Sequence, residues 1–469
     1  MRQGLLPYTI EVVSARDTLT ARAGLPLVVE QMRALGLDRV IAEHVRVRTR
    51  ASGYPEAATV EALVLLLASG GECVDDLAVL KADTGLSRLL GRPLPSADAL
   101  WTFLQAFHDD ALLTAAQAAR GPDQVAYIPG ESAPLQGLAV VNAALVHRVA
   151  AQGKGTVATL DHDATLLECH KRAALPHYKG GRGYQPAAVY WVEQDLVVAD
   201  EYRDGNVPAG MDNLPLIRRA FATLPPSVTT RYFRADSACY DERILKWLAD
   251  PKRPDGPQGP IGFTLSADMT AELQKACKAV PAWTLCEDRP DETVCLAEVV
   301  FTPGDWRKDA APLRYVALRI QKKQGHLFAG GFDTKYLAIV SNRWELPAPA
   351  LVRWHWQKAG TIEHVHDITK NELGAATPPG GRFGANAAWY RLCHLTYNVL
   401  SALKSLVLPA HLSSARPKRL RFCLFTLPGR LVTHAGRLIL RLSAEAEGLV
   451  GLIGARLRLL ALQPLAASG

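Results

Sequence analysis

The sequence predicts an α/β protein with a helical N-terminal region and a core of strands and helices that a mainly β insertion interrupts. Three observations predict this arrangement. Apolar residues recur at helical spacing before residue 150, short runs rich in Val, Thr and Leu begin near residue 155, and helical spacing returns after residue 351. With 469 residues, the chain is long enough for two or three domains and a sizeable core.

The composition restricts the class of protein. Its 48% hydrophobic and 21% charged residues are typical of a globular chain and argue against global disorder. The formal net charge of +7 permits an anionic partner, and the stretch 404–441 holds eight Lys or Arg and no Asp or Glu. Eight cysteines without a C-x-x-C pair argue against a zinc module or a disulfide framework. With no signal-peptide pattern and an apolar run (60–70) too short for a bilayer, we expect a cytoplasmic protein with no membrane partner.

Residues 1–150 are expected to be mostly helical. The run PEAATVEALVLLLASG begins with a proline and ends at Gly70, and it predicts a buried helix. A further helix is predicted over 96–107, with Ser96 as N-cap and Asp98 in the first turn. Both a DNA-binding helix-turn-helix and an ordinary helical packing region fit this pattern.

The core is expected to begin at residue 151 and to contain the insertion. Residues 155–169 predict a strand, 187–206 a hairpin and 228–239 another strand before a helix, so 151–250 forms the first part of the core. A linker rich in Pro and Gly opens the region 251–350, where three short strands predict the β insertion. Residues 351–469 predict the second part: one helix over 351–373, a long helix after 385 and a basic helical C-terminal region.

Acidic side chains stand where two of the predicted strands end. Asp161 and Asp163 are two residues apart on a strand and therefore share a face, and Asp236 ends a later strand. Strand ends of an α/β core are common ligand sites. Hard oxygen ligands favour Mg²⁺ or Mn²⁺, and two such ions ~4 Å apart suit attack on a phosphodiester. For each aspartate alone, an N-cap, turn or ion-pair role is the alternative.

The segment TIEHVHDITKNEL, 361–373, is unusually polar for a helix. Glu363 and Lys370 lie two turns apart on the same face, so the carboxylate can hold a metal while the lysine binds a phosphate. A solvated face with intrahelical ion pairs is the alternative. His364 and His366 point to different sides, which argues against a joint zinc site. We interpret these histidines, together with Asp367 and Glu372, as bystanders.

The order and setting of these acidic residues are similar to those of a known protein family. The Asp-x-Thr strand, the later strand-end Asp236, the β insertion and the Glu-x6-Lys helix resemble the DDE transposases of bacterial insertion sequences. The stretch AGTIEHVHDITKNELGAATPPGGRFGANAAWYRL is especially similar to the insertion-sequence 1380 family. The resemblance implies a ribonuclease-H-like core, a mixed sheet flanked by helices. It assigns the metal carboxylates to Asp163, Asp236 and Glu363, with Asp161 as the rival for the first position.

The resemblance also implies cofactors and partners. It implies two Mg²⁺ ions, with Mn²⁺ as a substitute, and double-stranded DNA in the form of terminal inverted repeats and target DNA. A homodimer in the DNA complex and a place at the bacterial nucleoid follow from the same resemblance. Related enzymes carry Tyr-x2-Arg-x3-Glu-x6-Lys on the last helix, where this chain has Trp356 and Ala359 before the glutamate. Lys358 or Arg353 is the candidate for the missing cation.

Several further residues are candidates for contacts with DNA. Relatives that form DNA hairpins stack a flipped base on an aromatic in the strand before the last helix, and this resemblance makes Tyr336 a candidate, with a core strand tyrosine as the alternative. The loop 177–186 is either a phosphate-binding loop or a surface turn. The run ARPKRLRF, 415–422, is either a DNA-facing amphipathic element or a solvated face. The DNA-contact candidates are Lys358, Lys370, Tyr336, Arg182, Arg203, Lys418, Arg419 and Arg421.

Three functions fit these features. The leading hypothesis is a cut-and-paste transposase that cleaves its element's ends and joins the 3′-OH to target DNA. The first alternative is a metal-dependent nuclease of the same fold without strand transfer. The second is a catalytically inactive DNA-binding regulator, against which the intact acidic residues argue.

Overall fold

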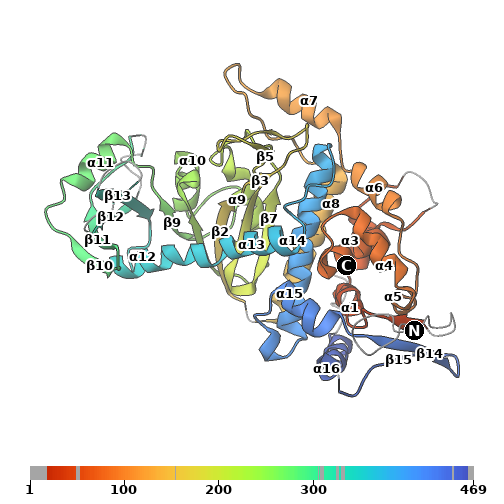
Figure 1. Cartoon of the computed structure of the whole chain (residues 1–469). Helices are drawn as coiled ribbons and strands as arrows, with labels where there is room; N and C mark the ends of the chain where they lie inside the picture. Colours follow the sequence, from red (N-terminus) through yellow and green to blue (C-terminus); the bar gives the residue numbers. More distant parts are fainter. Residues whose placement is uncertain are drawn as a thin grey trace.

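A computed structural model of the chain describes residues 18–48, 53–153, 155–304, 306, 311–323, 327–328, 333–445 and 448–462. Figure 1 shows a central sheet with helices packed around it, the N-terminal helices at one end and the β-rich insertion at the other. Every helix within these residues is too short or too polar to cross a bilayer. All eight cysteines lie in the described part of the chain as free thiols.

The N-terminal region is helical, as the sequence predicts. The helix that follows Pro55 is buried on nearly all sides, and the Ser96 hydroxyl accepts a hydrogen bond from the Ala99 N–H (3.1 Å), which confirms the predicted cap. The elements here are β1 (Thr18–Thr20), α1 (Pro26–Ala34), α2 (Leu37–His44), α3 (Glu56–Ser69), η1 (Val74–Asp76), α4 (Leu77–Ala82), α5 (Thr84–Leu90), α6 (Ala97–Gln105), α7 (Asp110–Ala119) and α8 (Ala133–Gln152).

A nine-stranded mixed sheet forms the centre of the molecule. Its strand order is β10-β11-β12-β13-β9-β8-β2-β6-β7, in which β2, β8 and β9 are parallel to one another and the other pairs are antiparallel. The strands are β2 (Val157–Ala164), β6 (Ala187–Trp191), β7 (Leu196–Glu201), β8 (Thr230–Ala235), β9 (Gly262–Ser266), β10 (Thr284–Asp288), β11 (Glu292–Val299), β12 (Arg314–Lys322) and β13 (Thr334–Ser341).

The two faces of this sheet have different coverings. Phe233 on β8 contacts Phe221 of α9 (Asn213–Ala222), with ring centroids 6.3 Å apart, so α9 covers that face. Arg234, the next residue, points to the opposite face and lies in register with Asp161. That opposite face lies under α12 (Ala348–Trp356), η4 (Gln357–Gly360) and α13 (Ile362–Glu372). The predicted acidic residues therefore face these C-terminal helices.

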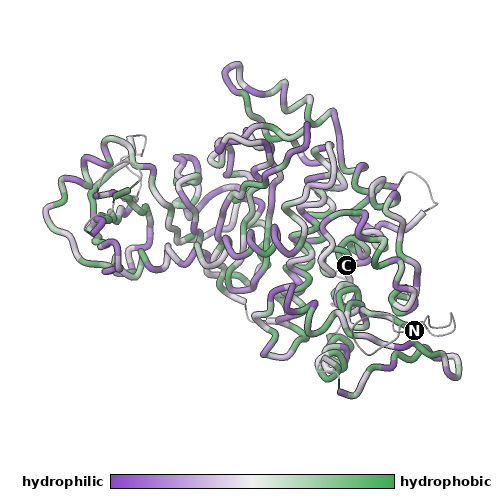
Figure 2. The backbone as a smooth tube through the Cα atoms, in the orientation of Figure 1, coloured by the Kyte–Doolittle hydropathy of each residue, from purple (hydrophilic) through white to green (hydrophobic). Residues whose placement is uncertain are grey.

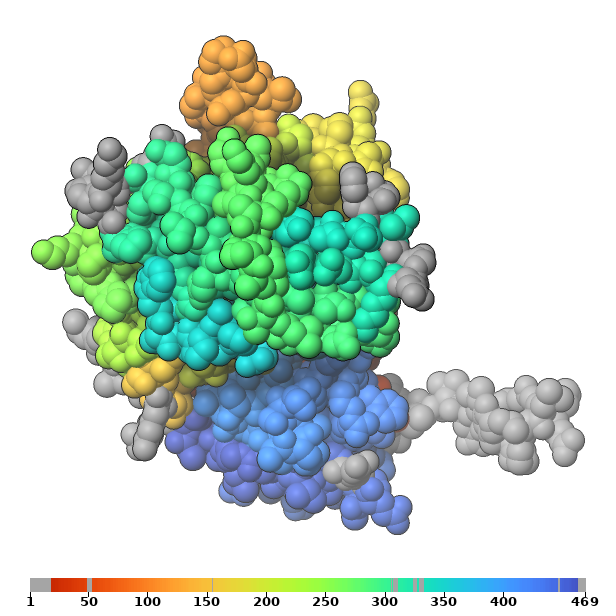
Figure 3. Space-filling view, turned by 90° about the vertical axis from the view of Figure 1, so that its left-hand side faces the viewer, coloured from red at the N-terminus to blue at the C-terminus, as the bar shows by residue number. Residues whose placement is uncertain are grey.

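The insertion extends the central sheet. The three predicted strands are β11, β12 and β13, and β13 pairs with β9 so that the insertion continues the same sheet. The predicted helix after β8 is α10 (Glu242–Ala249), and the structure adds β10 and α11 (Ala271–Lys278) to the predicted elements. Figure 3 shows the insertion, green to cyan, above the blue C-terminal segment on one face of the molecule.

The prediction of one continuous helix over 351–373 is wrong. Helix α12 ends at Trp356, a 3₁₀ turn follows, and Thr361 leaves the helical region with φ −112° and ψ −86° before α13 begins. Gly360 is a poor helix former, and the Thr361 hydroxyl donates to the Asp161 carboxylate, which holds the break in place. Trp356 and Ala359 therefore do not share a helical stripe with Glu363.

The C-terminal region is only partly helical, which corrects a second prediction. Helix α14 (Phe383–Leu406) is the predicted long helix, and η5 (Ala410–Leu412), α15 (Pro417–Leu420), the π-helical turn η6 (Arg421–Phe425) and α16 (Gly448–Ala461) follow. Between η6 and α16 lies a hairpin of β14 (Gly429–His434) and β15 (Arg437–Arg441), and β14 also pairs with β1. Its turn uses Ala435 and Gly436 at positive φ. Figure 2 shows hydrophobic stretches, green, alternating with hydrophilic ones along the chain.

Candidate active site

The candidate site lies at the carboxyl ends of the adjacent parallel strands β2 and β8. Asp163 is the penultimate residue of β2, and Asp236 directly follows β8. The register that pairs Asp161 with Arg234 brings Asp163 next to Asp236. Asp236 is half-buried and its Oδ1 accepts the Ala238 N–H (3.1 Å), which fixes that side chain at the start of a 3₁₀ turn.

Glu363 in the first turn of α13 is the third acidic residue of this site. Its side chain is exposed, and no hydrogen bond or ion pair joins it to another residue of the described ranges. Burial raises the pKa of the Asp163 carboxyl, the Lys358 ammonium opposes this rise, and the charges of Asp236 and Glu363 add to it. The three carboxylates are therefore electrostatic neighbours.

The structure gives Asp161 a different environment from Asp163. The Asp161 side chain is fully buried and accepts two hydrogen bonds from Arg234, from Nε to Oδ1 (2.6 Å) and from Nη2 to Oδ2 (2.8 Å). The Thr361 hydroxyl donates to the same carboxylate. Because Thr361 is the residue just before the helix that carries Glu363, this contact joins Asp161 on strand β2 to the start of α13, and the Asp161 carboxylate does not face solvent.

Lys358 in the 3₁₀ turn η4 points at the acidic residues. Its Nζ lies 3.2 Å from Asp163 Oδ1, and the lysine side chain is only 10% exposed. Burial alone would lower the pKa of Lys358, but the nearby charges of Asp163 and Asp236 outweigh it and raise the pKa above its usual value. A permanent cation therefore neutralises part of the acidic cluster.

His366 is a site residue that the sequence interpretation placed among the bystanders. It is buried on α13, and its Nε2 lies 3.7 Å from Asp163 Oδ2. Burial lowers its pKa well below the usual value, with the charges of His394, Lys370 and Lys358 adding to the effect, so the ring is neutral. The sequence does place His366 one turn after Glu363 on the same helix, and this spacing could have identified it as a neighbour of the site.

The donor set can be compared with the needs of Mg²⁺. Three carboxylates from two strand ends and a helix are the hard oxygen ligands that Mg²⁺ and Mn²⁺ prefer, and the Glu363 carboxylate has no other partner in the described ranges. As the side chains stand, no three metal-ligating groups among the described residues converge closely enough to enclose an ion. Lys358 instead supplies the positive charge at Asp163. The chemistry of the residues thus fits such an ion.

Lys370 extends the site by two turns along α13. Its Nζ donates to the Thr165 hydroxyl (3.0 Å), just beyond the end of β2. Burial lowers the pKa of Lys370, Asp367 and Asp163 oppose this, and Lys179 adds to it. The lysine therefore lies beside the acidic site with one hydrogen bond to a neutral group and no ion pair in the described part of the chain.

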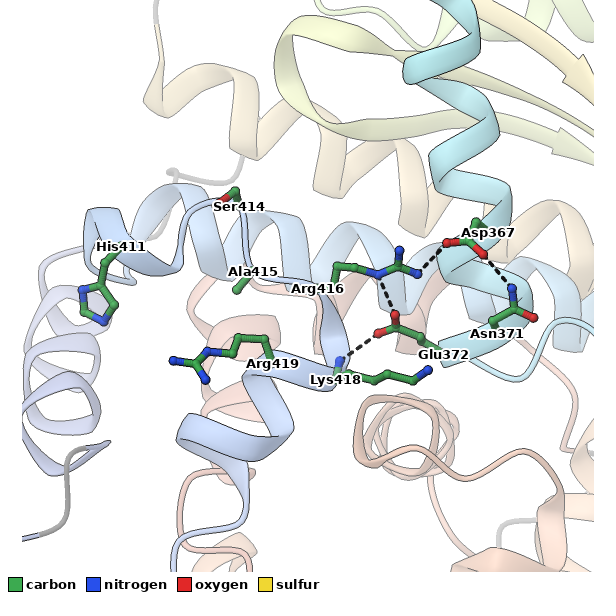
Figure 4. Close-up of a pocket in the computed structure, with 9 residues that line it drawn as sticks. All are labelled: Asp367, Asn371, Glu372, His411, Ser414, Ala415, Arg416, Lys418 and Arg419. Carbon is green, nitrogen blue, oxygen red and sulfur yellow. Dashed lines mark hydrogen bonds and ion pairs between the residues drawn. The ribbon is translucent and has the colours of Figure 1, made fainter.

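A basic pocket of about 960 Å³ continues from the far end of α13. Figure 4 shows Arg416 reaching across it to Asp367 (2.6 Å) and Glu372 (2.6 Å), while the Lys418 N–H donates to Glu372 (2.8 Å). The exposed ammonium of Lys418 and the exposed guanidinium of Arg419 have no ion-pair partner among the described residues. These two cations are available to an anionic ligand.

The remaining candidates have structural contacts of their own. Arg421 donates to the carbonyls of Leu67 (3.1 Å), Ala68 (2.8 Å) and Glu372, which ties the C-terminal segment to α3 and α13. Arg203 is fully buried against Glu201 and Asn213. Neither guanidinium is free to contact DNA in this structure.

Arg182 and Tyr336 lie on different parts of the molecule. Arg182 is exposed, although one of its guanidinium nitrogens donates to the Ala174 carbonyl (2.8 Å). Tyr336 is half-buried on β13, where its ring packs against Trp283 with centroids 6.0 Å apart. Tyr336 is therefore part of the packing of the insertion.

The chain is similar to known transposases. No curated protein matches the chain. A solved structure similar to it is the cryo-EM structure of piggyBac transposase in a synaptic complex with hairpin DNA, at 12% sequence identity and a TM-score of 0.44, over 87% of this chain and 81% of that one. The family described as "Transposase DDE domain group 1" matches residues 8–454. The chain therefore belongs to the DDE transposases of group 1.

Proposed function

We propose that this protein is a DNA transposase that binds the terminal inverted repeats of its element, cleaves the ends and joins their 3′-OH groups to target DNA. The observation that carries the proposal is that Asp236 and Glu363 lie near enough to Asp163 for their charges to raise its pKa, in a chain of the DDE transposase family. The five-strand order β7-β6-β2-β8-β9, with antiparallel pairs on one side of β2 and parallel strands on the other, supports a ribonuclease-H-like core.

In this proposal the three carboxylates hold Mg²⁺, and Mn²⁺ can substitute. Two such ions, when bound, supply the charge that activates water or a 3′-OH and stabilises the phosphodiester transition state. The buried Asp161–Arg234 pair and Thr361 fix the start of α13, so that Glu363 is presented to the two strand-end aspartates.

Two lysines act on the substrate side of the site. Lys358 keeps Asp163 ionised and supplies the cation that the usual signature takes from an arginine at the position of Ala359. Lys370, which has no ion-pair partner among the described residues, binds a phosphate of the DNA end. Together they offset the repulsion between three carboxylates and the phosphate backbone.

The DNA continues past α13 along the basic pocket. Lys418 and Arg419 contact its backbone there, and these contacts give no sequence preference. A homodimer holds the two ends, and the protein acts in the bacterial cytoplasm at the nucleoid. The similarity of 359–392 to the insertion-sequence 1380 family supports a place in that group.

The test uses the DNA that flanks the gene, including any inverted repeats. Wild-type protein with Mg²⁺ is expected to nick this DNA at the repeat boundary and to produce strand-transfer products with a target plasmid. Glu363→Gln is expected to lose both activities while footprinting still shows protection of the repeats. Cleavage by Glu363→Gln at the wild-type rate contradicts the site, and cleavage without any joined product favours a nuclease.

A further inference from the structure

A small three-stranded sheet stands beside the candidate active site. It consists of β3 (Leu167–Glu168), β4 (Leu175–Pro176) and β5 (Arg182–Tyr184), in the order β3-β5-β4, and it follows β2 directly in the chain. The turn between β4 and β5 carries Tyr178, whose side chain is 74% exposed. An aromatic ring this exposed gains little from packing within the fold and is free to contact a ligand.

Hydrogen bonds hold the backbone of the turn that carries this ring. His177 is buried and donates its N–H to the Gly181 carbonyl (2.9 Å), while the Gly180 N–H donates back to the His177 carbonyl (3.0 Å). His177 Nδ1 also accepts the Lys179 N–H (3.2 Å). Gly180 has φ +92°, a conformation that a residue with a side chain rarely adopts. The exposed ring is therefore presented by a well-bonded turn.

The surroundings of Tyr178 are cationic. Residues 170–182 contain four Lys or Arg and no Asp or Glu. Lys179 Nζ lies 5.7 Å from the centre of the Tyr178 ring. The sheet that carries this turn begins at Leu167, two residues after Thr165, whose hydroxyl accepts a hydrogen bond from Lys370 (3.0 Å). The charge of Lys179 also contributes to the low pKa of Lys370. An anionic polymer that carries flat apolar bases matches such a surface better than a protein partner does.

We propose that Tyr178 stacks an unpaired base at the end of the DNA while Lys179 contacts the adjoining phosphate. This inference rests on the proposed function, because it takes the bound DNA end at Asp163 as its starting point. The turn then separates the terminal base pair next to the scissile phosphate, and the Tyr178 ring replaces the stacking that the base loses. Base–aromatic stacking is sequence-tolerant, so Tyr178 contributes to recognition of an open end and not of a base sequence.

The experiment uses two fluorescein-labelled 25-bp duplexes with the sequence of the DNA that flanks the gene, without divalent metal. One is fully paired, and the other has two mismatched pairs at one end with 2-aminopurine in the mismatch. Wild-type protein is expected to bind the mismatched duplex more tightly and to quench the 2-aminopurine several-fold. Tyr178→Ala is expected to lose the quenching and to bind the mismatched duplex about 5- to 50-fold more weakly, while affinity for the paired duplex changes less than twofold.

Two matched variants complete the test. Tyr178→Phe keeps the ring and is expected to quench like the wild type, and Trp344→Ala removes another exposed aromatic, at 58% exposure, and is expected to change nothing. Quenching that persists in Tyr178→Ala, or equal weakening for both duplexes, overturns the role of Tyr178. Absence of binding to either duplex by the wild type overturns the proposed function itself, so the two failures are distinguishable.

Discussion

The Lys358 ammonium lies 3.2 Å from the carboxylate of Asp163, a residue 195 positions earlier in the chain. This pair joins the 3₁₀ turn between α12 and α13 to the end of β2. It puts a cation among the three carboxylates and so permits them to remain ionised at close range. The first prediction follows from this contact.

Removing the cation should raise the pKa of Asp163 further, because burial and the charges of Asp236 and Glu363 would then be unopposed. An ionised carboxylate is needed to hold a metal. In Lys358→Met the acidic limb of the pH–cleavage profile should therefore move to higher pH, by about one unit. Lys358→Arg keeps the charge and should leave the limb near its wild-type position. An unchanged limb in Lys358→Met would show that the pair does not control Asp163.

The two neighbouring aspartates should respond differently to the same substitution. Asp161→Asn leaves Arg234 buried without its anionic partner and should cost about 3–5 kcal/mol of unfolding free energy. Asp163→Asn removes a carboxylate that burial destabilises, as its raised pKa indicates, but leaves the buried Lys358 without its partner, so its loss of stability at neutral pH should be smaller. Urea unfolding of both variants makes this comparison. Equal losses of stability would contradict the separate roles.

Asp204 should make stability depend on pH in an unusual direction. Its carboxyl is buried, and burial raises its pKa from 3.8 to about 6. The folded state therefore binds the proton more tightly, so the cost of ionising Asp204 is absent below pH 4, grows up to pH 6 and is complete above it. Asp204→Asn should stabilise the protein at pH 8, by about 3 kcal/mol, and have little effect at pH 4. Thermal unfolding at the two pH values tests this, and a stabilisation that is larger at pH 4 would be the wrong sign.

The basic pocket should contribute to DNA affinity through charge alone. Lys418→Ala and Arg419→Ala should each weaken binding to any duplex and reduce the slope of log affinity against log salt by about one. Arg437→Ala removes another exposed cation, on β15, and is the matched control, expected to leave the slope unchanged. Fluorescence anisotropy from 50 to 300 mM salt measures the slopes. Equal effects of all three substitutions would indicate general attraction to a positive protein.

Much of the fold was predictable because its local patterns are strong. The alternating runs at β11, β12 and β13 and the apolar spacing of α14 give clear periods. The C-terminal hairpin was missed because its arginines read as part of a basic helical region, whereas alternation on both sides of Ala435 and Gly436 was the better signal. The break before Thr361 depends on a hydroxyl contact with Asp161, which local sequence does not reveal.

The candidate site was predictable in its acidic residues and not in their supports. Strand alternation put Asp161 and Asp163 on one face but could not separate them, because the difference lies in Arg234, which is 73 residues from Asp161. Lys358 and His366 could not be assigned to Asp163, since both contacts need the helix break and the packing of α13 on β2. Arg203 and Arg421 were predicted to contact DNA because of their charge, but in the fold their guanidinium groups bind protein partners instead.

The central claim is that Asp163, Asp236 and Glu363 hold the metal while Asp161 does not. Its most direct test is to replace each in turn with cysteine and to measure cleavage of the flanking repeat DNA in Mg²⁺ and in Mn²⁺. A thiolate is a poor ligand for Mg²⁺ and a better one for Mn²⁺. We predict that the three ligand variants are inactive in Mg²⁺ and partly restored by Mn²⁺, whereas Asp161→Cys shows no such metal-dependent recovery. Full activity of Asp163→Cys in Mg²⁺, or recovery confined to Asp161→Cys, would contradict the account.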